Sequence, residues 1–321
     1  MKKLLLPLLL LLIACTGTSE PPLDLLLATG DGNAVVFYPA GTEDTAPVGS
    51  WNLGMEVVDL LRLEGESRLW VLTPDRLLAY PLSGGTLSSP PAQSAPGTTL
   101  EPAEDCSNGK LVGGATHLLL DCGNGHVWTV ALANPALTPV ETADDGAGTI
   151  YLLGPDDRLT RISPQLDGFE LRYPGPDGEL TYDVSAAEGV DRLTAKWAGE
   201  ELLIAVDSGY DVRTYTWTAA SSSPPKIAGD PLPITGLTTI LAVNDGWIVA
   251  GEGGYVLKRK NEEDLQRTTP VQTGVVTPNL YAYLAADGKL TVLDLLDPAL
   301  AEHPRSFPAR PRGLVWLPVG E

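Results

Sequence analysis

Three acidic turns contain the residues most suited to chemistry, because carboxylate and backbone oxygens gathered in one loop can bind Ca²⁺. The turns are residues 30–33 (Gly-Asp-Gly-Asn), 144–146 (Asp-Asp-Gly) and 154–157 (Gly-Pro-Asp-Asp). None of them has the alternating acidic loop with a distal bidentate glutamate that an EF-hand uses. Asp, Asn and Gly also favour turns for conformational reasons alone. We therefore interpret them as structural turns and assign no metal ligand and no cofactor.

Sequence motifs for covalent or nucleotide chemistry are missing from the chain. It has no Gly-x-Ser-x-Gly turn, His-Glu-x-x-His helix, phosphate-binding loop or dinucleotide fingerprint. The three histidines are His117, His126 and His303. His117 and His126 lie near Cys122 on one expected hairpin, but their spacing indicates no joint ligand role. Catalytic residues stay unassigned, since a site assembled from distant segments does not show as a motif.

The amino-terminal residues have the order of an export signal. Two lysines precede an apolar run over residues 4–14, which is too short for a membrane-spanning helix of about 20 residues. Residues 12–15 (Leu-Ile-Ala-Cys) resemble the lipobox of bacterial lipoproteins. The resemblance implies cleavage after Ala14 and a lipid on Cys15. An ordinary secretory signal is the alternative, and it would leave Cys15 as an unpaired thiol in an oxidising compartment.

The same resemblance implies a location and a division of the chain. Acyl chains on Cys15 would hold the protein on a membrane without spanning it. In enteric bacteria, an aspartate directly after the lipidated cysteine signals retention at the inner membrane. Here that position is Thr16, so the rule favours the periplasmic face of the outer membrane. We expect residues 1–14 to be removed, residues 15–22 to be a lipidated flexible tether, and residues 23–321 to form one domain.

The other two cysteines are expected to form a disulfide. Outside the reducing cytoplasm, an even pair such as Cys106 and Cys122 usually oxidises. A turn at residues 113–115 would place the two opposite each other, and the bridge would close a loop of about 15 residues and contribute about 3 kcal/mol. A redox-active pair or a metal site is the alternative, although Cys-x-x-Cys spacing is missing.

The composition indicates an acidic globular protein. Its formal net charge of −20 becomes −22 when the two lysines of the signal are removed. Such a charge argues against nucleic-acid binding, which needs clustered Lys and Arg. It favours solubility, basic partners or loosely held cations. The 34 glycines and 28 prolines are scattered between apolar runs, as in a protein built from many short strands.

A hairpin pattern recurs seven times along the chain. Each copy has an apolar β-rich run, a tight turn and a second alternating run. The mean step is about 43 residues, close to the length of a β-propeller blade. The steps are uneven, and a further hairpin at residues 176–178 leaves six or eight blades as alternatives. The seven turns lie at residues 30–33, 74–75, 123–125, 155–157, 207–209, 251–254 and 286–288.

The carboxyl end explains how such a ring would close. Residues 313–317 form a strand-like run without a hairpin partner, while the first repeat lacks a preceding strand. We expect this last strand to complete the first blade. The predicted fold is therefore all-β: a β-propeller of seven four-stranded blades closed by the C-terminal strand.

Two segments resemble known propeller families. Residues 283–294 resemble the YVTN-type repeat. They contain the tetrapeptide Tyr-Leu-Ala-Ala, then a glycine, then the segment Leu-Thr-Val-Leu-Asp. Residues 38–51 resemble the repeat of quinoprotein-like propellers, a group that includes the propeller lipoprotein of the outer-membrane β-barrel assembly machine. Both resemblances imply an architecture and no particular activity.

Two functions fit these features. The first is a non-enzymatic, lipid-anchored scaffold that binds another envelope protein through its top face or a blade edge, with an accessory role in outer-membrane protein assembly as one version. The alternative is a propeller enzyme or ligand-binding protein, such as a metal-assisted hydrolase or lactonase, with acids from several blades around the central channel. The expected anchor, the repeat and the missing motifs favour the scaffold.

Overall fold

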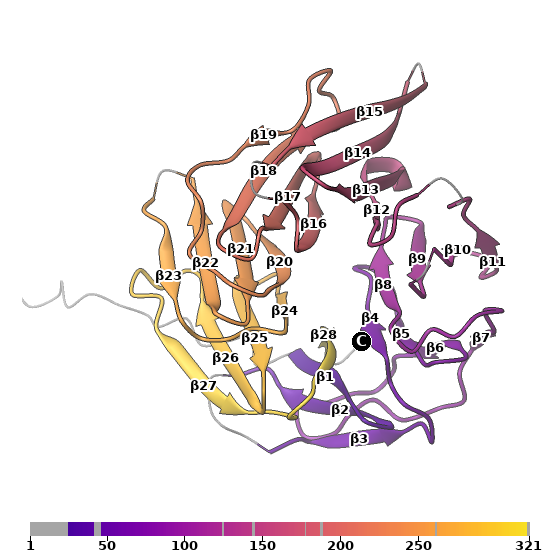
Figure 1. The fold of residues 1–321 in the computed structure, drawn as a ribbon. Helices are drawn as coiled ribbons and strands as arrows, with labels where there is room; N and C mark the ends of the chain where they lie inside the picture. Colours follow the sequence, from indigo (N-terminus) through magenta and orange to yellow (C-terminus); the bar gives the residue numbers. More distant parts are fainter. Residues whose placement is uncertain are drawn as a thin grey trace, which may run out of the picture.

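The computed structural model describes residues 25–41, 46–123, 125–142, 145–176, 178–186, 189–260 and 262–319. In this part of the chain, strands form seven antiparallel sheets of four strands each. One short 3-10 turn, Pro155–Asp157, joins two neighbouring strands of the same sheet. The sheets stand around a common centre (Figure 1). The fold is a seven-bladed β-propeller, which confirms the sequence prediction.

Each blade is an antiparallel sheet, and its four strands are named here in order from the centre of the ring outward. Blade 1 contains β28 (Arg312–Pro318), β1 (Leu25–Asp31), β2 (Ala34–Pro39) and β3 (Gly49–Asn52). Blade 2 contains β4 (Asp59–Leu61), β5 (Arg68–Leu72), β6 (Leu77–Pro81) and β7 (Thr98–Leu100). Blade 3 contains β8 (Lys110–Gly113), β9 (His117–Asp121), β10 (Val127–Ala131) and β11 (Leu137–Pro139).

The remaining four blades follow the same order. Blade 4 contains β12 (Ile150–Leu153), β13 (Leu159–Gln165), β14 (Gly168–Gly175) and β15 (Gly178–Ser185). Blade 5 contains β16 (Arg192–Ala198), β17 (Glu201–Asp207), β18 (Val212–Thr218) and β19 (Lys226–Ile227). Blade 6 contains β20 (Leu237–Val243), β21 (Gly246–Gly251), β22 (Gly254–Arg259) and β23 (Leu265–Arg267). Blade 7 contains β24 (Thr273–Val276), β25 (Tyr281–Ala286), β26 (Lys289–Asp294) and β27 (Glu302–Ser306).

Blade 1 is built from both ends of the described chain. Strand β28 pairs antiparallel with β1, and Leu26 lies opposite Leu317. The Thr29 hydroxyl donates a hydrogen bond of 2.7 Å to the carbonyl of Gly313 across this pair. The C-terminal strand therefore supplies the innermost strand of the first blade, as the unpaired run at the carboxyl end predicted.

The hydrophobic core lies between the blades. Trp51 of blade 1 packs against Phe37 of the same blade and Tyr80 of blade 2, with ring centroids 4.8 and 5.5 Å apart. Tyr173 of blade 4 and Trp217 of blade 5 form a similar contact at 5.2 Å. Because each sheet has apolar side chains on its faces, only the neighbouring blades can cover them.

The uneven steps of the sequence repeat have a structural explanation. In six blades the predicted turn joins the second and third strands, but in blade 4 residues 155–157 join the innermost strand to the second. The equivalent turn there is Leu166 and Asp167, between β13 and β14. The steps from 124 to 167 and from 167 to 208 are then 43 and 41 residues. Treating residues 155–157 as an equivalent repeat turn was therefore wrong.

The additional hairpin near residue 176 belongs to blade 4. The chain between Gly175 and Gly178 joins β14 to β15, the third and outermost strands of that sheet. Residue 177 itself lies outside the described residues. The alternative of an eighth blade at this position is therefore replaced by a long outer hairpin in blade 4.

The two faces of the ring are defined by the turns. The turns between second and third strands lie on one face, which we call the upper face. Those between innermost and second strands lie on the opposite, lower face. Strand β1 enters at Leu25 on the lower face, since its other end, Asp31, reaches an upper turn. Among the described residues, no helix has the length and apolar character to cross a membrane.

Candidate functional site

Asp157, in the third acidic turn, contacts the neighbouring blade. Its carboxylate accepts hydrogen bonds from the backbone N–H groups of Ala115 (2.6 Å) and Thr116 (2.7 Å) and from the Thr116 hydroxyl. The Nδ1 atom of His117 lies 3.3 Å from Oδ2 of Asp157. Burial opposes ionisation, but these hydrogen bonds outweigh it and hold the pKa of Asp157 below its ordinary value. The carboxylate thus joins blades 3 and 4.

Asp145, in the second acidic turn, is also engaged, while Asp144 lies outside the described residues. Its carboxylate lies 3.4 Å from Arg161 Nε and 3.6 Å from Arg172 Nη1. It accepts a hydrogen bond of 3.1 Å from the hydroxyl of Tyr151. Because two arginines and a tyrosine already surround these oxygens, the contacts support the interpretation as a structural turn.

The structure separates the histidines and joins the two cysteines. His117 begins β9 at the lower face, whereas His126 precedes β10 at the upper face, so they lie at opposite ends of one hairpin. His303 is on the outermost strand of blade 7. Cys106 and Cys122 form the predicted disulfide, buried between blades 2 and 3. Over the described ranges, no three His, Cys, Asp or Glu side chains are grouped to hold a metal ion.

The centre of the ring carries more basic than acidic residues. It is bordered by the seven innermost strands (Figure 1). Asp59 is the one acidic residue in these seven described strands. It accepts hydrogen bonds of 2.8 Å from the N–H groups of Leu60 and Leu111, and burial raises its pKa to about 6. The basic residues in the same strands are Lys110, Arg192, Lys196 and Arg312.

This charge distribution bears on the alternative function. A metal-assisted hydrolase of the expected type needs several carboxylates around the centre to hold the ion. The seven innermost strands instead contain one carboxylate, which is hydrogen-bonded to backbone, and four basic residues, of which Arg192 and Arg312 pair with Glu252 and Glu56. The strands that border the centre therefore do not build the acidic arrangement on which the enzyme hypothesis rests.

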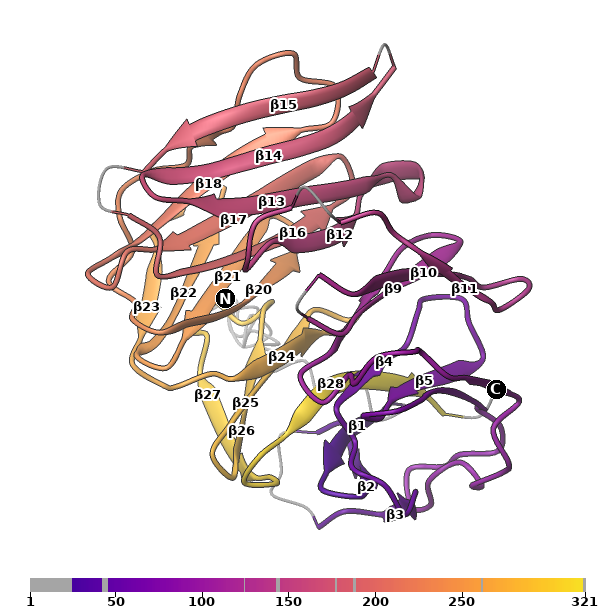
Figure 2. The ribbon, with the colours of Figure 1, turned by 45° about the vertical axis from the view of Figure 1, so that its right-hand side comes forward.

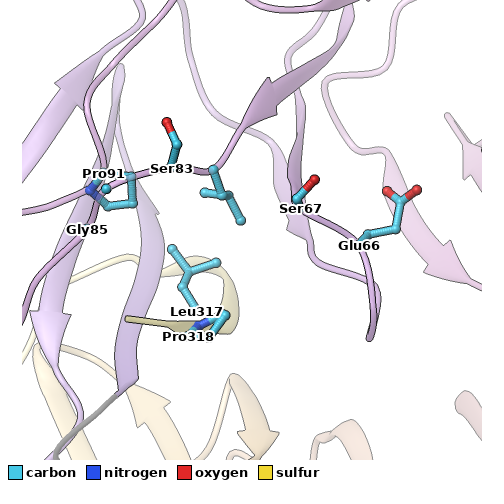
Figure 3. Close-up of a pocket in the computed structure, with 9 residues that line it drawn as sticks. Glu66, Ser67, Ser83, Gly85, Pro91, Leu317 and Pro318 are labelled. Atoms are coloured by element: carbon cyan, nitrogen blue, oxygen red, sulfur yellow. The ribbon is translucent and has the colours of Figure 1, made fainter. Parts of the chain in front are cut away.

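Two depressions lie near the seam at blade 1. The first, on the lower face, has a volume of about 70 Å³ and lies where Leu317 and Pro318 face Ser83 and Pro91 (Figure 3). The second, on the upper face, has a volume of about 530 Å³ and is lined by Gln272, Asp287 and residues 309–312. Neither lining contains a histidine or a cysteine, so neither supplies the usual partner for a nucleophile.

The upper face of blades 4 and 5 carries two exposed apolar side chains. Leu166, in the β13–β14 turn, is 88% exposed, and Tyr210, in the β17–β18 turn, is 85% exposed. They occupy equivalent turns of adjacent blades, and we call them the apolar pair. Large apolar side chains exposed to water on one face are typical of a protein contact surface, where a few aromatic or aliphatic anchors supply most of the binding energy.

Acidic residues surround this pair on the same face. An acidic residue lies in, or directly before, every turn between a second and a third strand, and we call this set the acidic ring. The set comprises Asp31, Asp75, Asp121, Asp167, Asp207, Glu252 and Asp287. Asp207 is buried and accepts hydrogen bonds from backbone, whereas Asp31, Asp75, Asp167, Glu252 and Asp287 are exposed. Glu252 and Asp75 pair with Arg192 (3.1 Å) and Arg76 (3.5 Å), which leaves Asp31, Asp167 and Asp287 as the exposed carboxylates of the ring outside an ion pair among the described residues. These carboxylates favour basic groups over acidic ones at the upper face.

Comparison with known proteins shows the class of fold. No protein-family model matches the chain, and no curated protein matches it in sequence. A candidate 6-phosphogluconolactonase from Bacteroides fragilis is similar in structure, with 12% identity, a TM-score of 0.65, and coverage of 95% of this chain and 99% of that chain. AztD from Citrobacter koseri has 13% identity, a TM-score of 0.60, and coverage of 91% and 97%.

BamB from Moraxella catarrhalis is similar to a lesser degree. It has 15% identity and a TM-score of 0.50, and the alignment covers 86% of this chain and 81% of that chain. Identities this low show the fold alone. The chain is thus a β-propeller, a class whose members share an architecture and differ in function.

Proposed function

We propose that this protein is a lipid-anchored scaffold of the bacterial cell envelope that binds a basic protein partner on its upper face. The observation that carries the proposal is the apolar pair, Leu166 and Tyr210, on equivalent turns of adjacent blades. Burying two such side chains contributes about 1.5–3 kcal/mol each, which is enough to anchor a contact. The surrounding acidic ring accelerates association with a partner of opposite charge.

The anchor supplies the orientation of this surface. Cys15 lies ten residues before Leu25, which enters the ring on the lower face. Ten residues span at most about 35 Å when fully extended. A lipid on Cys15 would therefore keep the lower face near the membrane and turn the apolar pair away from it. Lipidation and the outer-membrane location both rest on the sequence around Cys15.

Crosslinking in intact cells tests the proposed contact. A photoreactive benzoylphenylalanine replaces Tyr210 in the full-length chain, and captured proteins are identified by mass spectrometry after affinity purification. The matched control carries the same group at Leu296, which is 60% exposed between β26 and β27 on the lower face. We expect one dominant envelope protein from position 210 and not from position 296. Equal capture from both positions, or none from position 210, refutes the proposal.

The anchor has a separate test. In cells fed labelled palmitate, the wild-type protein should incorporate label and fractionate with the outer membrane. The Cys15→Ser variant should do neither, because it lacks the thiol that receives the lipid. A labelled Cys15→Ser protein, or an unlabelled wild type, contradicts the lipoprotein assignment without affecting the crosslinking result.

A further inference from the structure

Blade 4 ends in an outermost strand that is longer than those of the other blades. Strand β15 has eight residues, and all eight pair with β14. The other outermost strands have two to five residues. Figures 1 and 2 both show β15 at the outer rim of the ring. A strand of this length at the edge of a sheet offers a continuous row of backbone donors and acceptors.

The register shows which backbone groups are available. The N–H of Ala186 donates to the carbonyl of Asp167, and hydrogen-bonded pairs alternate along an antiparallel ladder. Residues 180, 182 and 184 therefore direct their backbone groups toward β14. The alternate residues direct theirs outward, and their side chains are exposed as well. These residues are Glu179, Thr181, Asp183 and Ser185.

The two faces of β15 differ in chemistry. Leu180, Tyr182 and Val184 are half-buried and pack on the apolar cluster that joins blades 4 and 5. The Tyr182 hydroxyl donates a hydrogen bond of 3.3 Å to the carbonyl of Ser221, in the loop before β19. The opposite face carries the exposed polar side chains of the alternate residues, two of which are carboxylates. Glu179 forms an ion pair of 3.2 Å with Arg161 Nη1, and Asp183 is the second carboxylate. The edge is therefore apolar toward blade 5 and polar, with two carboxylates, away from it.

Blade 5 presents an exposed apolar side chain toward this edge. Ile227 of β19 pairs with Tyr215 of β18, so both side chains lie on the same face of the sheet. Tyr215 packs against Phe169 of blade 4, with ring centroids 5.2 Å apart, so this face is turned toward blade 4. Ile227 is 60% exposed. An added strand beyond β15 would direct its apolar residues toward this side.

We propose that β15 is a docking edge for an extended segment of a partner protein, which adds to blade 4 as a fifth strand with basic and apolar residues in alternation. Basic residues of the segment face Asp183 and Glu179, where they share the Glu179 carboxylate with Arg161, and apolar residues face blade 5. Outward N–H and carbonyl groups of β15 supply the hydrogen bonds. A second copy of this chain would bring the same carboxylates to the edge, which disfavours self-association.

This inference deepens the proposed function and takes its biological setting from it. The β15 edge belongs to blade 4, whose β13–β14 turn carries Leu166 of the apolar pair. One basic protein could therefore contact the upper face of blades 4 and 5 and extend a strand along the rim. The chemistry of the edge itself, however, is tested on the purified full-length protein without any cellular partner.

The probe is a capped peptide of alternating lysine and valine, seven residues long, at about 1 mM. Hydrogen exchange of the outward amides of Thr181 and Asp183 is the readout, because these N–H groups have no partner strand in the free sheet. We expect the peptide to slow their exchange by about tenfold or more. A peptide with glutamate in place of lysine should give no protection. No protection by the lysine peptide overturns the inference.

Two variants at one position separate strand addition from unspecific charge binding. Thr181→Pro removes an outward N–H and leaves the ladder to β14 intact, since proline is tolerated at an edge. Thr181→Val keeps the N–H. We expect Thr181→Val to retain the protection at Asp183 and Thr181→Pro to lose it, with the same urea midpoint as the wild type. Equal protection in both variants overturns the inference.

The peptide experiment at β15 and the crosslinking experiment at Tyr210 can fail independently of each other. Capture of a partner from Tyr210 without peptide protection at β15 overturns this inference and leaves the scaffold standing. Peptide protection at β15 without a partner captured from Tyr210 supports the docking edge and refutes the upper-face scaffold.

Discussion

The contact between Asp157 and blade 3 leads to a stability prediction whose size follows from its hydrogen bonds. Ala115 N–H donates to Oδ1 and Thr116 N–H donates to Oδ2. Asparagine at position 157 keeps the volume but offers one oxygen, so its NH₂ group must face one of these donors. Losing one partner and the negative charge costs about 1–3 kcal/mol. We expect Asp157→Asn to lower the free energy of unfolding by this amount.

Asp156 supplies the matched control within the same turn. Both residues have left-handed backbone angles, with φ of 56° at Asp156 and 57° at Asp157, and asparagine tolerates this region as aspartate does. The Asp156 side chain is exposed. We expect Asp156→Asn to change the free energy of unfolding by less than about 0.5 kcal/mol. Urea titration followed by tryptophan fluorescence measures both variants.

The pH dependence of the free energy of unfolding provides a second test of the same contact. Because hydrogen bonds hold the folded pKa of Asp157 below its ordinary value of about 4, its stabilisation is present above that pH. The stabilisation is lost as pH falls through the folded pKa, so the difference between wild type and Asp157→Asn should shrink in acid. An Asp157→Asn variant as stable as wild type at pH 7, or an equal loss from Asp156→Asn, refutes the reasoning.

Three further predictions concern the ring. Deleting residues 312–319 should open it and lower the melting temperature seen by circular dichroism, and a deletion variant that melts like the full chain refutes closure by β28. Replacing Cys106 and Cys122 with serine should lower the free energy of unfolding by about 3 kcal/mol in urea titration, and an unchanged midpoint contradicts this. The Asp59 carboxyl should titrate near pH 6 by NMR, because burial raises its pKa in the folded protein. The free energy of unfolding should then rise as pH falls from 6 toward 4. A carboxyl that titrates at its ordinary pH refutes the burial argument.

Turn chemistry made the ring predictable from the sequence. Gly, Asp and Asn are required where the chain reverses tightly, so six of the turns between second and third strands were visible as residue patterns. Blade 4 was misread because residues 155–157 have the same composition but join different strands. Its equivalent turn begins with Leu166, an apolar residue that a search for polar turns passes over.

The proposed contact surface was less predictable than the ring. Leu166 and Tyr210 are apolar residues inside turn sequences, and this mismatch was the one available signal for them. Their exposure depends on how the blades are placed, which spacing alone does not reveal. Asp157 bonds to groups about forty positions earlier, so its role appears only when blades 3 and 4 meet. Lipidation of Cys15 stays a prediction, because that residue lies outside the described part of the chain.

The position of β28 has a consequence for how the ring forms. Leu26 lies beside Leu317, so the innermost strand of the first blade is synthesised after all the other described strands. Contacts between residues so distant in sequence form slowly. Until β28 arrives, the inner edge of β1 is unpaired and open to pairing with other strands. Translation must therefore pass residue 318 before the first blade is complete, and a protein that lacks β28 exposes that edge to proteases.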